Sequence, residues 1–135
     1  MNVNVLIISH TGVGRALAQT AFDILGKEFP IKITNAEVEL TTDPDEILPD
    51  LLIALDELDE GAGVLILTDL LGATPSNTAI KLAQAAKNQT QVVSGINLAM
   101  LLSVLNYYQH DLNTLAQHAY EGGQQGIVIK TGYLQ

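Results

Sequence analysis

Apolar runs alternate along the whole chain with segments in which apolar residues recur every three or four positions. Two continuous runs rich in leucine and β-branched residues, at positions 3–8 and 64–67, are typical of strands buried on both faces of a parallel sheet. Residues 31–40 alternate apolar and polar side chains imperfectly, which predicts a strand at an edge of the sheet. Two shorter strands are predicted at 91–95 and 127–129.

The segments between these strands have the periodicity of amphipathic helices. The first helix is predicted over residues 14–29, with Thr11 or Gly12 as its N-cap. A second begins with Asp43 as N-cap and Pro44 in its first turn, and glycines at 61 and 63 end it. Further helices are predicted over 76–86, 98–107 and 112–120. The glycine-rich residues 121–126 predict a turn before the last strand.

The alternation of strands and helices predicts parallel strands joined by right-handed crossovers. We therefore expect a doubly wound, three-layer α/β/α fold with strand order 2-1-3-4 and residues 127–129 as a C-terminal edge strand. In this order the winding reverses between the first and third strands, and such sheets bind ligands at the carboxyl ends of those strands. The two strands end in His10 and Asp69, so we predict that these side chains meet there.

Composition narrows the class of protein. The chain has 135 residues, of which 47% are hydrophobic, and this predicts one globular domain over residues 1–135. It has no cysteine and no N-terminal signal peptide, and no apolar run approaches the roughly 20 residues that cross a bilayer. We therefore expect a cytoplasmic protein without direct membrane insertion.

The charge of the chain is uneven. The net charge is −9, and ten of the fifteen acidic residues lie between Glu37 and Glu60 with no lysine or arginine among them. Such a segment repels phosphate backbones, which disfavours nucleic-acid binding. The segment is explained either as a solvated face that keeps the protein soluble or as a surface that steers a basic protein partner.

The predicted meeting of His10 and Asp69 indicates proton or group transfer. A carboxylate that accepts a hydrogen bond from one ring nitrogen leaves the other nitrogen with a free lone pair, so His10 is a candidate general base or nucleophile. A hydrolase is disfavoured because the chain has no Gly-x-Ser-x-Gly elbow. Thr68, Thr74 and Ser76 are nucleophile candidates only through proximity in the sequence. The alternative is a structural histidine that caps a helix or bonds a nearby carbonyl.

The residues that follow the two strands favour an anion as the ligand. Gly12 and Gly14 allow backbone N–H groups to approach a ligand at the start of one helix. Gly72, Ala73 and Thr74 offer further amides and a hydroxyl at the start of another. Together they predict a phosphoryl-binding site in which the histidine is the acceptor.

Common cofactor motifs are absent from the sequence. It contains neither a Walker lysine motif nor a full Gly-x-Gly-x-x-Gly, so no nucleotide cofactor is expected. Arg15 either neutralises phosphate charge or is an ordinary helix-surface arginine. His110 and His118 lie two turns apart on a predicted late helix and have no carboxylate in a recognised ligand spacing. We expect surface histidines there and no metal site.

Three segments, taken together and in this order, resemble a known family. They are Ser9-His10 after an apolar strand, the loop TDLLGATPSN at 68–77, and VSGINLAML at 93–101. They resemble the IIA component of the mannose family of the bacterial phosphoenolpyruvate:sugar phosphotransferase system, in its single-domain form. The resemblance covers essentially the whole chain.

The resemblance implies a phosphotransferase with a phosphohistidine intermediate, in sugar uptake or in a regulatory branch of the relay. His10 would accept the phosphoryl group from the histidine-containing phosphocarrier protein and pass it to a IIB protein. Asp69 would orient the imidazole, and residues 72–74 would receive the phosphoryl oxygens. The resemblance also implies a homodimer with the last strand exchanged or paired between subunits. The chain departs from the family at Thr11, where glycine is usual, and at Leu71, two positions after the aspartate, where an aromatic residue is common.

Two other classes of protein stay open from the residues alone. A receiver-like signalling domain would be phosphorylated on Asp69, but it predicts an acidic pair after the first strand, where Ser9-His10 stands. A non-catalytic module would bind an anion at the same crevice without reacting with it.

Overall fold

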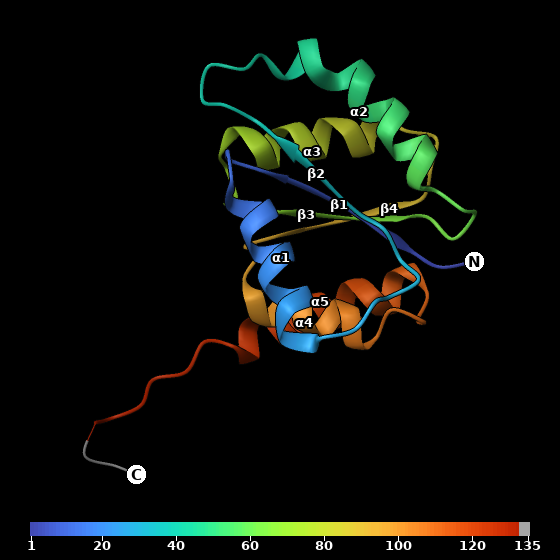
Figure 1. Cartoon of the computed structure of the whole chain (residues 1–135). Coiled ribbons are helices and arrows are strands. Elements are labelled where there is room, and N and C mark those ends of the chain that lie inside the picture. The colour runs from blue at the N-terminus through green and yellow to red at the C-terminus, as the bar shows by residue number, and fades with distance from the viewer. Residues whose placement is uncertain (133–135) are drawn as a thin grey trace.

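The computed structural model describes residues 1–132 of the chain, in which strands and helices alternate (Figure 1). In chain order the elements are β1 (Asn4–Ser9), α1 (Val13–Leu25), β2 (Ile33–Glu37), α2 (Pro44–Leu58), β3 (Val64–Thr68), α3 (Thr74–Ala85), β4 (Thr90–Ser94), α4 (Leu98–Asn106) and α5 (Leu112–Gln125). Within this described part, none of the helices combines the length and the apolar character that crossing a membrane requires.

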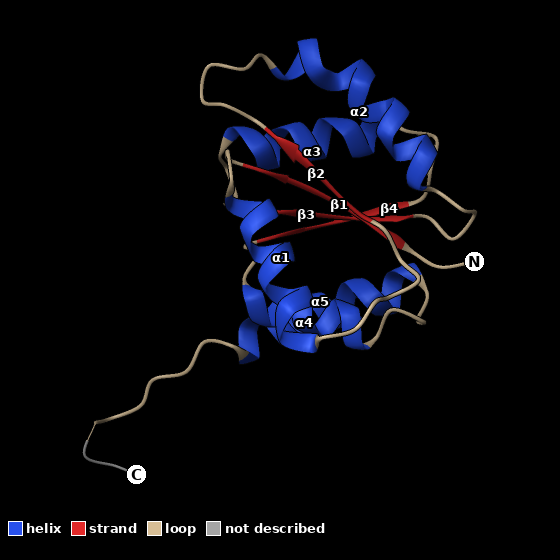
Figure 2. Ribbon diagram, viewed as in Figure 1, coloured by secondary structure: helices blue, strands red, loops and turns tan. Residues whose placement is uncertain are grey.

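The sheet has the predicted topology. Its four strands are all parallel and lie in the order β2-β1-β3-β4, so the expected order 2-1-3-4 is confirmed. Helices α2 and α3 cover one face of the sheet, and α1, α4 and α5 cover the other (Figure 2). The prediction that residues 31–40 contain an edge strand is confirmed, because β2 pairs with β1 alone.

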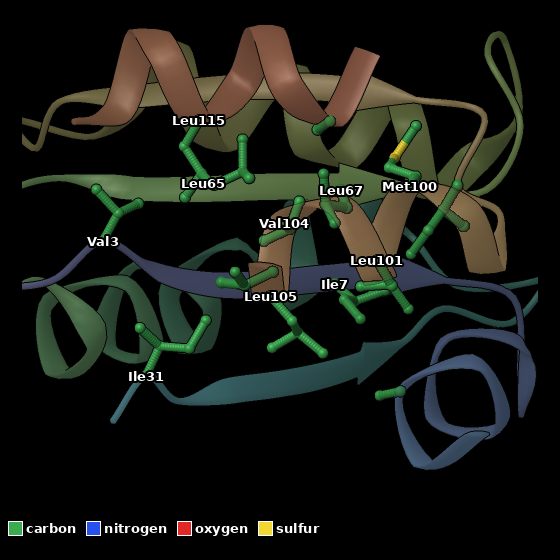
Figure 3. Close-up of a cluster of buried hydrophobic side chains, with 14 of the residues drawn as sticks. Val3, Ile7, Ile31, Leu65, Leu67, Met100, Leu101, Val104, Leu105 and Leu115 are labelled. Carbon is green, nitrogen blue, oxygen red and sulfur yellow. The ribbon is translucent and has the colours of Figure 1, made fainter. Parts of the chain in front are cut away.

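The central strands β1 and β3 are buried along their whole length, which explains their continuous apolar sequences. Alternate residues of a strand point to opposite faces of the sheet. Ile7 and Leu65 accordingly join a cluster with residues of α4 and α5 (Figure 3), whereas Leu6 and Ile66 join a cluster with residues of α2 and α3. Each of these apolar strands thus contributes residues to both clusters. The residues that follow β1 and β3 leave the sheet from these well-packed strands.

The end of α5 corrects the sequence-based expectation. Residues 121–126 were expected to form a turn, but α5 continues to Gln125. The glycines serve close helix packing instead. A Cβ atom on Gly122 would lie 2.5 Å from the Cβ of Ser103, and one on Gly126 would lie 2.4 Å from the Cβ of Ala99. The energy of α4–α5 contact therefore outweighs the low helix propensity of glycine.

Replacing Gly122 by valine is expected to destabilise the fold by about 2 kcal/mol, because overpacking a close contact typically costs roughly 1–3 kcal/mol. The added side chain would force α4 and α5 apart at Ser103. Urea unfolding followed by circular dichroism measures the change. The neighbouring exposed position provides a matched control, since Glu121→Ala should alter the free energy of unfolding by less than about 0.5 kcal/mol. Equal stability of the two variants would contradict the packing role of Gly122.

The predicted C-terminal edge strand is not observed in the single chain. Residues 127–129 have no strand assignment, and the sheet of the described chain ends at β4. The segment leaves α5 and runs away from the sheet (Figure 1), and Ile129 is 95% exposed. Its β-branched residues favour an extended backbone, but a strand forms only where a neighbouring strand completes its hydrogen bonds.

Candidate functional site at the carboxyl edge of the sheet

The ends of β1 and β3 bring together the two residues on which the predicted site depends. These strands are neighbours in register, with Ile8 opposite Thr68, so the chain leaves both at the same edge. There the His10 ring nitrogen Nδ1 lies 2.7 Å from Oδ2 of Asp69. The backbone N–H of His10 donates to the same oxygen at 2.9 Å. The predicted meeting of these side chains across the crevice is therefore present in the structure.

The carboxylate of Asp69 is held on both of its oxygens. While Oδ2 bonds His10, Oδ1 accepts a hydrogen bond of 3.0 Å from the backbone N–H of Leu70. A carboxylate fixed in this way also fixes the imidazole plane and favours the tautomer with its proton on Nδ1. The other ring nitrogen, Nε2, is then the one with a lone pair.

The pKa of Asp69 lies below its ordinary value. Burial is the largest single influence and raises this pKa, but three contributions from His10, together with a backbone hydrogen bond of Asp69 itself, outweigh it. The three from His10 are the hydrogen bonds from the His10 backbone N–H and ring, and the attraction of the ring's charge. Asp69 is therefore ionised at neutral pH and can act as an acceptor toward the ring.

An open hollow of about 470 Å³ lies beside His10, and we call it the His10 hollow. It is lined by His10, Thr11, Val38, Glu39, Leu40 and Thr41. The His10 side chain is 30% exposed, so the ring is open to a partner molecule. Leu40, which lines the hollow, and Leu70 and Leu71, which follow Asp69, are strongly exposed, which gives this edge of the sheet an apolar rim.

Helices α1 and α3 both begin at this edge (left in Figure 1). Neither N-cap residue, Gly12 or Ala73, caps its helix with a side chain of its own, whereas the side chains of Asp43, Asn97 and Asp111 cap α2, α4 and α5. The expected cap at Gly12 is thus confirmed, and the Thr11 side chain does not cap the helix. Two helix starts without side-chain caps at one edge favour an anionic ligand.

The predicted phosphoryl-binding residues lie on the two loops of this edge, but not all their amides are free. The N–H of Ala73 bonds the carbonyl of Leu70 at 3.2 Å, and the N–H of Gly12 donates to Glu37 Oε1 at 3.2 Å. Gly72 has a φ of 86°, and a Cβ atom there would meet nothing within 4 Å. Thr74 is the first residue of α3.

Gly14 proves to be a packing residue and not a ligand-facing one. Its N–H donates to the buried hydroxyl of Ser9 at 3.0 Å. A Cβ atom on Gly14 would lie 2.5 Å from Cγ2 of Ile7 and 2.7 Å from Oδ1 of Asn35. Glycine at this position therefore lets the first turn of α1 lie directly on β1 and β2, which positions the loop that carries His10.

The hydroxyl groups of Thr68 and Ser76 belong to a buried network and have no access to a substrate. The Thr68 hydroxyl donates to Ser94 Oγ at 2.8 Å, and Ser76 Oγ lies 3.0 Å from the same atom. Thr68 and Ser76 are fully buried. Their role is to join the ends of β3 and β4 to the first turn of α3, so they are not nucleophiles.

The two remaining histidines lie on another part of the molecule. His110 precedes α5 instead of lying on the same helix as His118, which corrects the sequence-based placement. The His118 ring stacks on Tyr107, with ring centroids 3.8 Å apart and planes 8° apart. Among the residues described, no group of three or more potential ligands is placed to hold a metal ion.

Glu37 is a residue of this site that its place in the sequence does not reveal. In the sequence it is only the first member of an acidic segment, but its carboxylate lies beside the β1–α1 loop. Its Oε1 atom is 2.9 Å from Nη2 of Arg15 and also accepts the hydrogen bond from Gly12. The register of β2 on β1, with Ser9 opposite Glu37, causes this placement. Only that register, which follows from the tertiary structure, indicates the contact.

Comparison with known proteins agrees with this geometry. The model of the family described as PTS system fructose IIA component (EIIA-man) matches residues 4–119. Among curated proteins, the chain is 26% identical over 129 residues to the PTS system mannose-specific EIIAB component of Escherichia coli (strain K12). That alignment covers 94% of this chain but 39% of the relative, so the chain spans about two fifths of the length of the curated relatives it matches.

Solved structures show the same fold. The mannose/sorbose specific IIA subunit of the phosphotransferase system from Enterococcus faecalis superimposes with a TM-score of 0.82 at 24% identity, over 100% of both chains. The PTS IIA protein associated with the fucose utilization operon from Streptococcus pneumoniae gives a TM-score of 0.78 at 22% identity, covering 96% of this chain and 93% of the other. These two proteins are named for different sugars, mannose/sorbose and fucose. What they have in common is that both are IIA proteins with this fold.

Proposed function

The chain belongs to the EIIA-man family of phosphotransferase-system IIA components, and on this basis we propose that it is a phosphocarrier whose acceptor is His10. The phosphoryl group would come from the histidine-containing phosphocarrier protein and pass to a IIB protein, in sugar uptake or a regulatory branch. We propose that residues 1–135 act as a single IIA domain in the cytoplasm. The observation that supports the proposal most strongly is the 2.7 Å contact between His10 Nδ1 and Asp69.

The geometry favours Nε2 as the atom that accepts the phosphoryl group, because Nδ1 is engaged by Asp69. In the proposed step the Nε2 lone pair attacks the phosphorus of the donor's phosphohistidine. An N–P bond forms at His10 while the N–P bond of the donor breaks, and the donor ring nitrogen keeps the electron pair. Nδ1 keeps its proton throughout, so the exchange consumes no water, cofactor or redox partner.

Asp69 would stabilise the phosphorylated ring. A ring with phosphorus on Nε2 and a proton on Nδ1 is cationic, and the ionised carboxylate lies against that proton. The same contact helps the ring leave when the phosphoryl group moves on to a IIB protein, because the departing imidazole keeps its Nδ1 proton. Asp69 is thus proposed to serve acceptance and release alike.

The start of α3 is proposed to receive the phosphoryl oxygens. Residues 72–74 lead into this helix, which has no side-chain cap. A phosphoryl group there would interact favourably with the positive end of the helix, and the Thr74 hydroxyl is an additional donor. Gly12 offers a further amide at the start of α1, although that amide is bonded to Glu37 in this structure.

The apolar rim near His10 is proposed as the surface on which both protein partners dock. Leu40 lines the His10 hollow, and Leu70 and Leu71 directly follow Asp69; all three are exposed. Exposed apolar groups gathered around one reactive side chain are typical of protein-binding surfaces. Leu71, the departure from the family's usual aromatic residue, lies on this rim, so it is expected to affect partner choice.

We propose that the chain forms a homodimer through its C-terminal segment. The apolar residues 127–129 are exposed, and β4 is an edge strand of the sheet in the described chain. An exposed β-branched segment and an available sheet edge are complementary between two copies. Light scattering should give the mass of a dimer for the full chain and of a monomer for a chain truncated after Gly126. A dimer that survives the truncation would contradict this arrangement.

Intact-mass measurement after incubation with phosphoenolpyruvate and the general phosphotransferase proteins tests the proposed function. A phosphohistidine adds one phosphoryl group that is lost in acid but is stable in alkali, whereas the acyl phosphate of a receiver domain is hydrolysed in alkali. We expect an adduct that is lost in acid and survives alkali. An adduct that is lost in alkali would identify a receiver phosphorylated on Asp69. A chain that binds inorganic phosphate but gains no adduct would be a non-catalytic anion-binding module.

A further inference from the structure

A carboxylate already lies against the loop that carries His10, and it is paired with a guanidinium. Glu37 ends β2 and is the register partner of Ser9, the residue before His10. The next residue, Val38, donates its N–H to the Ser9 carbonyl at 2.9 Å and lines the His10 hollow. The backbone of Glu37 is therefore held firmly beside the acceptor loop and does not belong to a free surface segment.

The side chain of Glu37 makes two contacts with α1. Its Oε1 atom accepts a hydrogen bond from Gly12 N–H at 3.2 Å and lies 2.9 Å from Nη2 of Arg15. Gly12 is the N-cap of α1 and follows His10 by two residues. An internal anion thus occupies a position where an approaching phosphoryl group would find its donors. The side chains of Glu37 and Arg15 are 29% and 68% exposed. Solvent therefore weakens, but does not abolish, the electrostatic interactions of both charges with a nearby group.

We propose that Glu37 and Arg15 act as an opposed charge pair that sets the phosphoryl-transfer equilibrium of His10. The inference rests on the proposed phosphocarrier function and deepens it. The negative charge of Glu37 repels the dianionic phosphoryl group on His10 and competes with it for Gly12. Arg15, the sole arginine of the sequence, attracts the phosphoryl group. Together they keep the free energy of phosphorylated His10 close to that of the phosphorylated donor and acceptor proteins.

The chemistry of the relay explains why such a pair matters. One N–P bond replaces another, so the intrinsic equilibrium constant between donor and acceptor is near unity, and neighbouring charges decide its value. A carrier has to accept and release the group with similar ease. Arg15 alone would favour retention, and Glu37 alone would oppose acceptance. Both are positioning residues in this account, since neither forms a bond to phosphorus.

Charge-neutral variants test the proposal through the equilibrium constant for transfer from the histidine-containing phosphocarrier protein. Glu37→Gln keeps an oxygen for Gly12 and removes only the charge, so it should raise the phosphorylated fraction of His10. Arg15→Gln should lower that fraction. Each constant is expected to shift roughly three- to tenfold, the scale of Coulomb interactions between partly exposed charges. In the double variant the two positions together again carry no net charge, as in the wild type, so its constant should lie between those of the single variants.

The controls separate local charge from other effects. Glu57→Gln makes the same chemical change at an exposed position near the end of α2, at the opposite edge of the sheet, and should leave the constant unchanged. Arg15→Lys keeps the charge and should lie closer to the wild type than Arg15→Gln does. High salt should reduce both shifts, which a purely structural role would not predict.

Two outcomes overturn the inference. One is that Glu37→Gln and Arg15→Gln shift the constant in the same direction, and the other is that neither variant differs from Glu57→Gln. Thermal unfolding of each variant verifies that it is folded. All variants keep His10, so an adduct on each of them upholds the proposed function even where the equilibrium fails to shift. A wild-type chain without any adduct would instead refute the proposed function itself.

Discussion

Replacement of His10 by asparagine is expected to abolish phosphorylation of the chain while leaving it folded. The asparagine amide nitrogen occupies a place similar to that of Nδ1, so it can still donate to Asp69, but no nitrogen with a lone pair remains at the position of Nε2. The intact-mass assay should therefore show no adduct on His10→Asn under conditions that fully modify the wild type. A smaller residue, as in His10→Ala, should give the same result.

The other two histidines of the sequence provide matched controls for this experiment. His110→Asn and His118→Asn change the same type of residue at positions distant from β1 and should retain the full adduct. His118 stacks on Tyr107, so a modest loss of stability is expected there without loss of the adduct. An adduct that persists in His10→Asn and disappears in Asp69→Asn would show that the modified residue is Asp69 and that the adduct is an aspartyl phosphate.

Replacement of Asp69 by asparagine is expected to slow phosphorylation of His10 on the order of 100-fold, because orienting and charge-stabilising groups typically contribute about this much or more. The neutral amide can present either its oxygen or its NH2 group to Nδ1. It therefore no longer selects one tautomer, and it no longer stabilises the cationic phosphorylated ring. Rapid-quench measurement of the phosphorylation rate at neutral pH tests this, with the final extent of modification as a second readout.

The stability of the same variant distinguishes a catalytic role from a structural one. The folded-state pKa of Asp69 is lowered, so its carboxylate stabilises the fold above its unfolded pKa, near 4, and this contribution is lost as the pH falls through the folded pKa. At pH 7 Asp69→Asn should lower the free energy of unfolding only modestly, because one oxygen can still accept hydrogen bonds. A variant that phosphorylates at the wild-type rate but unfolds easily would show that Asp69 is only a structural cap.

Much of the architecture follows from local sequence features. The apolar runs of β1 and β3 have no polar face, and such strands are stable only in the centre of a parallel sheet covered on both sides. Once these two strands are adjacent, the residues that follow them leave the sheet at one edge. The meeting of His10 with Asp69 was therefore predictable from the order of the elements, without any side-chain coordinates.

Other features depend on which surfaces pack together. The glycines of α5 read locally as a turn, since glycine is a poor helix former, but contact with Ala99 and Ser103 of α4 requires residues without a Cβ. In the same way, the sequence position of Ser76 near Asp69 indicated a candidate nucleophile. In the structure Ser76 is buried, and its hydroxyl forms a hydrogen bond with Ser94. Both interpretations failed because the partner lies far away in the sequence.

The sequence by itself determined the strand order, the central position of β1 and β3, and the pairing of an imidazole with a carboxylate at their ends. Strand burial and helix periodicity are short-range patterns, and topology follows from them through general rules of connection. Only the tertiary structure decided which nitrogen of His10 is free, and that Glu37 bonds the loop that carries His10 and pairs with Arg15. Those properties depend on the register of neighbouring strands and on side-chain distances of a few ångströms, and no local pattern in the chain encodes them.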